Sequence, residues 1–246
     1  MGILEDRVVW VTGSARRVGR AIALACAREG ADIVVHCNHS HDDGVATAAE
    51  IRAMDREAIL VQGDHARRDE VEHMVATIGE QFGRIDALVN SAAIFPAKAF
   101  DCTGDAEFDE VINANLRGPF LCTQLALPLL RNSTAKPAHV INLLDAYLPR
   151  PYAKFAAYWC AKGGLDALTR ALAAELAPSI VVNGISPGPV LPPEHFSEEK
   201  QALSAEKTLV KRWGKPEDIA RAVVFLLASD YVTGANIVVD GGRSLA

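Results

Sequence analysis

The chain has few cysteines, no long uncharged apolar run and no excess of positive charge. Its five cysteines are odd in number, widely spaced and without a Cys-x-x-Cys pair, which argues against a disulfide framework and a zinc knuckle. Without a run of about 18 apolar residues, no membrane span is expected. The beginning of the sequence lacks the basic and apolar regions of a signal peptide, so we expect a cytoplasmic protein.

The charge balance is acidic. Lys and Arg number 25 against 31 Asp and Glu, a formal net charge of −6, so the chain has no general attraction to nucleic acid or anionic lipid. Half of the residues are apolar and 23% are charged, which excludes disordered and low-complexity classes. A length of 246 residues with one continuous pattern fits a single large domain.

That pattern is an alternation of short β-branched runs with longer amphipathic segments. The expected strands are Arg7–Val11, Asp32–Cys37, Ala58–Val61, Asp86–Val89, His139–Leu144, Ile180–Gly184 and Asn236–Val239. The expected helices are Val18–Glu29, Asp42–Met54, Asp69–Phe82, Glu107–Leu130, Tyr152–Leu176 and Glu217–Ala228. Such alternation predicts an α/β fold: a doubly wound, seven-stranded parallel sheet of the Rossmann type in one domain.

One stretch breaks the alternation. Prolines 187, 189, 192 and 193 precede a polar, helical segment that runs to Val210. Long irregular segments in compact domains often cover binding sites, so we expect a substrate lid around 187–212.

A glycine-containing turn follows the first strand. Residues Thr12–Gly19 read TGSARRVG and lead directly into a helix, where backbone amides can bind a pyrophosphate. A tight turn that binds nothing is the alternative. If the turn holds a dinucleotide, the residues in contact with it are Gly13, Arg16, Arg17, Val18 and Gly19.

An acid is missing after the second strand. Sites that prefer NAD usually place a carboxylate there for the ribose hydroxyls, whereas this chain reads His36–Ser40, HCNHS, with no acid before Asp42. Donors for a ribose phosphate are Arg17, Asn38, His39 and Ser40. We therefore expect NADPH rather than NADH, with His36 in the same site. The alternatives are that His36, His39 and His41 are solvated loop residues, or that they bind a metal; no acid or Cys stands at ligand spacing, so no metal is expected.

Tyr158 and Lys162 are four residues apart and share one face of an expected helix. A nearby ammonium stabilises a phenolate and lowers the pKa of the phenol from about 10. The pair therefore suits a proton donor for carbonyl or imine reduction. Taken alone, it is also a common surface pairing.

In combination, these motifs resemble the short-chain dehydrogenase/reductase family over essentially the whole chain. The matching residues are Thr12-Gly13 and Gly19, Asp64, Asn90 to Ala93, Asn115, Tyr158 and Lys162, Asn183-Gly184, Pro187-Gly188, and Val239 to Gly242. The resemblance implies a cofactor site that includes Asp64 and His65 at the adenine, Asn90, Ser91 and Ala92 behind the nucleotide, Lys162 at the ribose, and Pro187 and Gly188 at the nicotinamide. It also implies Tyr158 as the acid, Asn115 as the holder of a proton-relay water, and a homotetramer.

Asp145 departs from the family pattern. It stands 13 residues before Tyr158, where the family normally has a serine that bonds the substrate carbonyl. A carboxylate would repel a developing oxyanion, whereas it suits a substrate that is protonated at nitrogen or offers N–H donors. A strand-end cap or salt bridge is the structural alternative.

With Asp145-Ala146, the TGxxxRxG turn and Gly241–Leu245, the chain resembles the pteridine reductase branch. In that branch an aromatic residue at the position of Phe95 stacks on the pterin, although Phe95 would also fit as packing beneath a loop. We expect an NADPH-dependent pterin reductase that uses Tyr158, Asp145, Phe95 and Arg17 at the substrate. The alternatives are a reductase of 3-oxoacyl thioesters or other small ketones, and a nucleotide sensor without catalysis.

Overall fold

The computed structural model describes residues 2–192 and 197–246. Seven strands form one sheet in the order β3-β2-β1-β4-β5-β6-β7, and every neighbouring pair is parallel. The strands are β1 (Val8–Val11), β2 (Asp32–Cys37), β3 (Ala58–Gln62), β4 (Ala87–Asn90), β5 (Ala138–Leu143), β6 (Ile180–Pro187) and β7 (Asn236–Val239). The predicted doubly wound, single-domain α/β fold is confirmed.

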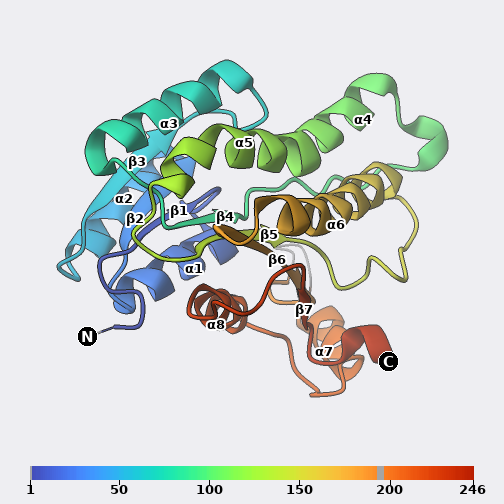
Figure 1. Cartoon of the computed structure of the whole chain (residues 1–246). Coiled ribbons are helices and arrows are strands. Elements are labelled where there is room, and N and C mark those ends of the chain that lie inside the picture. Colours follow the sequence, from blue (N-terminus) through green and yellow to red (C-terminus); the bar gives the residue numbers. More distant parts are fainter. Residues whose placement is uncertain (1, 193–196) are drawn as a thin grey trace.

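Helices cover both faces of the sheet (Figure 1). One apolar core joins the sheet to α1 (Arg17–Arg28), α2 (His41–Arg52) and α8 (Pro216–Leu227). The core on the opposite face joins it to α3 (Arg68–Phe82), α5 (Gly118–Arg131) and α6 (Ala156–Leu176). The central strands are buried along their whole length, which explains their continuous β-branched sequences.

The prediction of one regular helix over Glu107–Leu130 is wrong. The segment consists of α4 (Asp105–Ile112), a π-helical turn at Asn113–Arg117, and α5. At the turn, the Gly118 N–H donates to the carbonyl of Asn113, five residues back. Pro119 follows at once and has no N–H for an α-helical bond, so the regular ladder is broken at this point.

The helix predicted from Tyr152 begins at Ala156 instead. Tyr152 and Phe155 have helical spacing to Tyr158, but their rings lie in a loop and pack against one another. Within the expected lid, α7 (Glu198–Glu206) confirms the predicted helical segment, and Ser197 caps it by accepting the Lys200 N–H. Pro193 lies outside the described residues.

The strand order places the functional edge of the sheet. The chain runs outward from β1 to β3 and then crosses back to β4 on the other side of β1. In such sheets ligands bind beyond the carboxyl ends of the strands where the order reverses. Across residues 2–192 and 197–246, we find no helix with the length and apolarity to span a membrane.

Candidate active site

The turn after β1 is closely packed. Gly13 has a φ of 65°, in the left-handed region, and a Cβ there would lie 2.9 Å from the Cα of Ala92. A Cβ at Gly19 would lie 2.3 Å from the Gly13 carbonyl oxygen. Glycine at both positions therefore lets the turn contact both the first turn of α1 and the chain that leaves β4.

The side chain of His36 is hydrogen-bonded to the main chain of this turn. Its Nδ1 accepts the Gly13 N–H at 2.9 Å and its Nε2–H donates to the Gly63 carbonyl at 3.0 Å. Burial, together with the nearby His65, lowers the pKa of His36 to about 4, so its ring is neutral. The view of His36 as a solvated loop residue is wrong: it is 1% exposed. Although it borders the cavity, both ring nitrogens are bonded to main chain and neither is left to bind a ribose phosphate.

The amino end of α1 points into the same region. Arg16 is the N-cap and makes no side-chain capping bond, so the first N–H groups of α1 have no capping side chain and are oriented to bind an anion. Arg17, at the first position of the helix, has a φ of 55°. Short-chain dehydrogenases/reductases usually have glycine at this position. In this chain an arginine adopts the left-handed backbone conformation instead.

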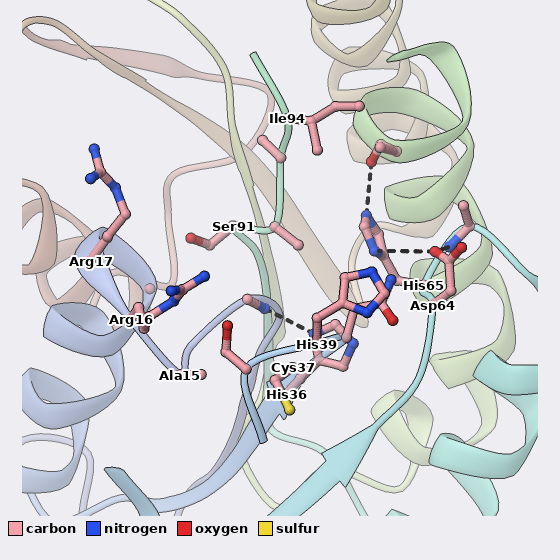
Figure 2. Close-up of a pocket in the computed structure, with 18 of the residues that line it drawn as sticks. Ala15, Arg16, Arg17, His36, Cys37, His39, Asp64, His65, Ser91 and Ile94 are labelled. Atoms are coloured by element: carbon pink, nitrogen blue, oxygen red, sulfur yellow. Dashed lines mark hydrogen bonds and ion pairs between the residues drawn. The ribbon is translucent and has the colours of Figure 1, made fainter. Parts of the chain in front are cut away.

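A cavity of about 830 Å³ lies beyond the carboxyl ends of β1, β2, β3 and β4. Its volume lies within the usual range for small-molecule and cofactor sites, about 300–1,000 Å³. The predicted cofactor residues that line it are Gly13, Arg16, Arg17, Val18, Gly19, His36, Asn38, His39, Ser40, Asp64, His65, Ser91 and Ala92. Figure 2 shows Arg16 and Arg17 on one side of the cavity and Asp64 and His65 on the other.

The lining also contains residues that the sequence analysis missed. Arg67 and Arg117 add two cations, from the N-cap of α3 and from the π-helical turn. Glu110 is an acid in the lining besides Asp64. Arg67 follows Asp64 closely and could have been found from that position, whereas nothing in the local sequence marks Arg117.

Two predicted asparagines do not point into the cavity with their side chains. Asn90 is buried and donates to the Asn142 side chain at 2.8 Å, which links β4 to β5. The Asn115 amide bonds the main chain of Ile94 in both directions, at 3.0 and 2.9 Å. If Asn115 holds a water, its main-chain carbonyl is therefore the group that does so.

Asp145, Tyr158 and Lys162 come together at the carboxyl end of β5. The Tyr158 hydroxyl donates to Asp145 Oδ2 at 2.8 Å, and Asp145 Oδ1 accepts the Tyr147 N–H at 2.8 Å. Lys162 is buried, and its Nζ donates to the Leu143 carbonyl at 2.6 Å and lies 5.7 Å from the centre of the Tyr158 ring. The structure thus brings three of the four residues predicted to be catalytic, all but Asn115, into one cluster.

The expected lowering of the pKa of Tyr158 is not what the structure gives. Burial, reinforced by the charge of Asp145 and its hydrogen bond, raises the pKa of Tyr158 above its ordinary value. Burial also raises the pKa of Asp145 and lowers that of Lys162 to about 8. The phenol therefore keeps its proton, and the Asp145 carboxyl takes one up more readily than a carboxyl in water.

Aromatic rings form one wall beside Tyr158. Phe95 stacks on Phe155 with ring centres 4.2 Å apart and 11° between the planes, and its edge contact with Tyr158 is 4.5 Å between centres. Tyr152 packs edge-on against both phenylalanines. Phe95 is 48% exposed, so it is not simply packing beneath a loop.

Trp159 contacts the loop before α6: its Nε1–H donates to the Tyr152 carbonyl at 3.1 Å. Pro187 and Gly188 lie next to Asp145, because the Ala146 N–H donates to the Pro187 carbonyl at 3.1 Å. The last residues of the chain complete this side, where the Arg243 guanidinium lies 5.5 Å from the centre of the Tyr147 ring.

Among residues 2–192 and 197–246, no group of three or more His, Cys, Asp or Glu side chains is arranged to hold a metal ion.

Comparison with known proteins matches almost the whole chain. A family model described as enoyl-(acyl carrier protein) reductase matches residues 13–244. The 3-oxoacyl-[acyl-carrier-protein] reductase FabG of Staphylococcus epidermidis is 36% identical over 239 residues, covering 94% of this chain and 96% of that protein. The 3-oxoacyl-[acyl-carrier-protein] reductase of Synechocystis sp. is 35% identical over 250 residues, 98% of each chain.

Solved structures of similar proteins also match the chain over essentially its whole length. A protein from Agrobacterium tumefaciens, provisionally named a gluconate dehydrogenase, superimposes with a TM-score of 0.91 at 34% identity and covers all of both chains. A provisionally named short-chain alcohol dehydrogenase from Sinorhizobium meliloti has a TM-score of 0.91 at 30% identity, covering 99% of this chain and 98% of its own. Fold, site and relatives together define an NAD(P)-dependent oxidoreductase. The chain belongs to the short-chain dehydrogenase/reductase family.

The names of these relatives do not support the pteridine reductase branch. Those of the curated relatives favour the alternative drawn from the sequence, reduction of a 3-oxoacyl thioester. They say nothing about Asp145, whose contacts with Tyr158 are a property of this chain.

Proposed function

We propose that the protein is an NADPH-dependent reductase of a planar nitrogen heterocycle with a ring C=N bond, a dihydropterin being the best example. The observation that carries the proposal is the hydrogen bond of the Tyr158 hydroxyl to the Asp145 carboxylate at 2.8 Å. Tyr158 is buried and Asp145 is half-buried, so bulk water screens the charge of Asp145 and this hydrogen bond only weakly.

The cavity fits a dinucleotide with a ribose phosphate. The tight turn at Gly13 and the amino end of α1 would hold the pyrophosphate, and Arg16, Asn38, His39 and Ser40 line the adjoining end without an acid among them. Arg16 already lies 3.6 Å from Asp43, an exposed ion pair that a phosphate would compete for. Asp64 at the opposite wall would accept from the adenine amino group. When bound, the nicotinamide supplies a hydride.

A carboxyl group beside the reacting atoms separates imine from ketone reduction. Reduction of a ketone builds negative charge on oxygen, which an Asp145 carboxylate would oppose. Reduction of a C=N bond needs a proton on nitrogen and leaves an N–H group. A carboxylate can accept a hydrogen bond from this N–H group. Burial raises the pKa of Asp145, so its carboxyl takes up that proton more readily than a carboxyl in water.

Tyr158 would give the proton to the ring nitrogen next to the carbon that is reduced. Lys162, fixed by its bond to the Leu143 carbonyl, places a positive charge 5.7 Å from the Tyr158 ring and would bind the ribose of the nicotinamide. The Asn115 carbonyl would hold the water that returns a proton to Tyr158. Asp145 would orient the heterocycle through its N–H groups.

The exposed ring of Phe95 would bind the flat face of the substrate. Offset stacking of aromatic rings adds about 0.5–1.5 kcal/mol beyond the burial of apolar area. Phe155 supports Phe95 from behind in a near-parallel stack, and Tyr158 meets its edge. Arg17, which lines the cofactor cavity, would reach the polar edge of the heterocycle. Residues 187–192 and 197–212 of the expected lid would close over this side.

A second candidate is reduction of a 3-oxoacyl thioester. The specific observation in its favour is the 36% identity to a FabG protein along almost the full length of both chains. Tyr158, Lys162 and Asn115 would serve a ketone as well, and only Asp145 and the aromatic wall argue against it.

The decisive experiment follows NADPH oxidation by the purified protein with a dihydropterin and, in parallel, with a 3-oxoacyl thioester. Saturable pterin turnover supports the proposal, and preference for the thioester replaces it with the second candidate. Asp145→Ser is the matched variant, since it installs the residue usual in the family. We expect it to lower pterin turnover and to raise ketone turnover; no change in either would make Asp145 structural.

A further inference from the structure

His65 lies where the cofactor cavity meets the π-helical turn between α4 and α5 (Figure 2). The residue is 8% exposed, and its Nε2 is 2.8 Å from the carbonyl oxygen of Ala114. Because a carbonyl only accepts, the proton of the neutral ring is on Nε2. The other nitrogen, Nδ1, faces Asp64 Oδ1 at 4.0 Å.

The carbonyl of Ala114 needs a donor from outside its helix. In an α-helix it would accept the N–H of residue 118, and in a π-helix that of residue 119. The Gly118 N–H is bonded to Asn113. Residue 119 is proline and has no N–H. His65 therefore supplies the bond that neither helical pattern can make at this carbonyl.

The shape of the turn is adapted to the ring. A Cβ at Gly118 would lie 2.1 Å from Cδ2 and 2.6 Å from Nε2 of His65. Any larger residue at 118 would push the ring away from the Ala114 carbonyl. The three residues thus act together. Pro119 lacks the N–H donor, Gly118 leaves space for a ring, and His65 occupies that space and supplies the donor.

The next residue in the turn is Asn115. Its side-chain amide is fixed to the Ile94 main chain, so the direction of its carbonyl depends on the main chain on either side. On one side that main chain is the peptide group that His65 holds. His65 also lies beside Asp64, on the adenine side of the cavity.

We propose that His65 is a positioning residue: by its bond to the Ala114 carbonyl it fixes the π-helical turn so that the Asn115 carbonyl can hold the proton-relay water. The inference rests on the relay in the proposed function and not on the identity of the substrate. It also assigns His65 a task beyond contact with the cofactor.

The test compares His65→Leu, which removes the donor, with His65→Gln, whose amide N–H can reach the same carbonyl. His139→Leu is the matched control, because His139 is also a buried histidine with a lowered pKa and lies at the start of β5, at the opposite edge of the sheet. The readouts are amide hydrogen exchange of residues 113–118, kcat and KM for whichever substrate is accepted, and the solvent deuterium isotope effect on kcat.

For His65→Leu we expect faster exchange in residues 113–118 and a fall in kcat of up to about a hundredfold, the effect of a displacement of about 1 Å near the reacting atoms. KM for the reducible substrate should stay within about twofold of the wild-type value, because only substrate-independent proton delivery is impaired. The solvent isotope effect should rise as proton delivery becomes limiting. His65→Gln should restore all three readouts, and His139→Leu should change none.

Unchanged exchange and kcat in His65→Leu, or no restoration by His65→Gln, would overturn the inference. If His65→Leu does not fold, Gly118→Ala displaces the ring without removing it and should give the same faster exchange and lower kcat. If neither substrate class is reduced, the proposed function fails, and the exchange of residues 113–118 still decides the structural part of the inference.

Discussion

Replacement of Asp145 by asparagine should make the protein more stable at neutral pH while it impairs reduction. Asparagine keeps the shape of the side chain: its Oδ1 can accept the Tyr147 N–H, and its Nδ2 can donate to the Tyr158 oxygen, which donates to Asp145 in the wild type. What is lost is the buried negative charge. Residues that serve catalysis at the expense of stability behave in this way.

The size of the effect follows from the pKa. Burial raises the pKa of Asp145 above 3.8, so the folded state binds a proton that the unfolded state has already released. The contribution of Asp145 to the stability of the wild type therefore falls as pH rises from 3.8 through the raised pKa, and is constant above it. We expect the stability gained by Asp145→Asn between acid and neutral pH to be about 1.4 kcal/mol for each unit by which burial raises the pKa.

The assay is urea unfolding of wild type and Asp145→Asn from about pH 4 to about pH 8. The stability advantage of the variant should grow with pH and then level off. Asp86→Asn is the control of opposite sign. Burial alone would raise the pKa of Asp86, but hydrogen bonds from Ser133, Val8, Ala135 and Arg84 lower it below its ordinary value. Its carboxylate contributes stability that is lost at low pH, so Asp86→Asn should be less stable at neutral pH, by about 1.5–3 kcal/mol for a bond to a charged group.

If the free energies of unfolding of Asp145→Asn and wild type differ by the same amount at every pH in this range, the reasoning is refuted. The charge of Asp145 would then not destabilise the folded state. A variant that is less stable than wild type at every pH would assign Asp145 to the support of the Tyr147 loop.

Tyr158→Phe should abolish turnover and leave NADPH affinity almost unchanged, measured by fluorescence titration; retained turnover would remove Tyr158 from the mechanism. Burial lowers the pKa of Lys162 to about 8, so kcat/KM should fall as pH rises through that value and the ammonium is lost, and a flat profile up to pH 9 would contradict this. Phe95→Ala should raise KM for a pterin by up to about tenfold, the equivalent of about 1.4 kcal/mol, and leave KM for NADPH unchanged. Light scattering should return the mass of a tetramer, as the resemblance implies; a monomer mass would disprove it.

The sequence predicts the fold well because burial on both faces of a parallel sheet leaves a strong pattern. β2 and β7 begin and end where their β-branched runs do. The π-helical turn at Asn113–Arg117 was not predicted, since apolar spacing is too coarse to show one inserted residue. The start of α6 was placed too early, because rings that pack on one another in a loop can have helical spacing by chance.

The site was predicted less completely. Motifs along the chain predicted Asp145, Tyr158 and Lys162, which the structure brings together. The contributions of His36 and His65 depend on main-chain groups distant in sequence, Gly63 and Ala114, and no local pattern reveals such pairings. For the same reason Phe155 was not recognised as the ring that supports Phe95.

Arg17 has a consequence for how this chain can vary. A left-handed backbone costs a residue with a Cβ roughly 1–2 kcal/mol, and glycine would avoid most of that cost. A single substitution to glycine would thus relieve the turn after β1, where Arg17 has its φ of 55°. The chain thus carries the Arg17 guanidinium on the lining of the cavity at a cost in stability. Arg17→Gly should therefore raise the free energy of unfolding of this chain while it removes the guanidinium from the cavity.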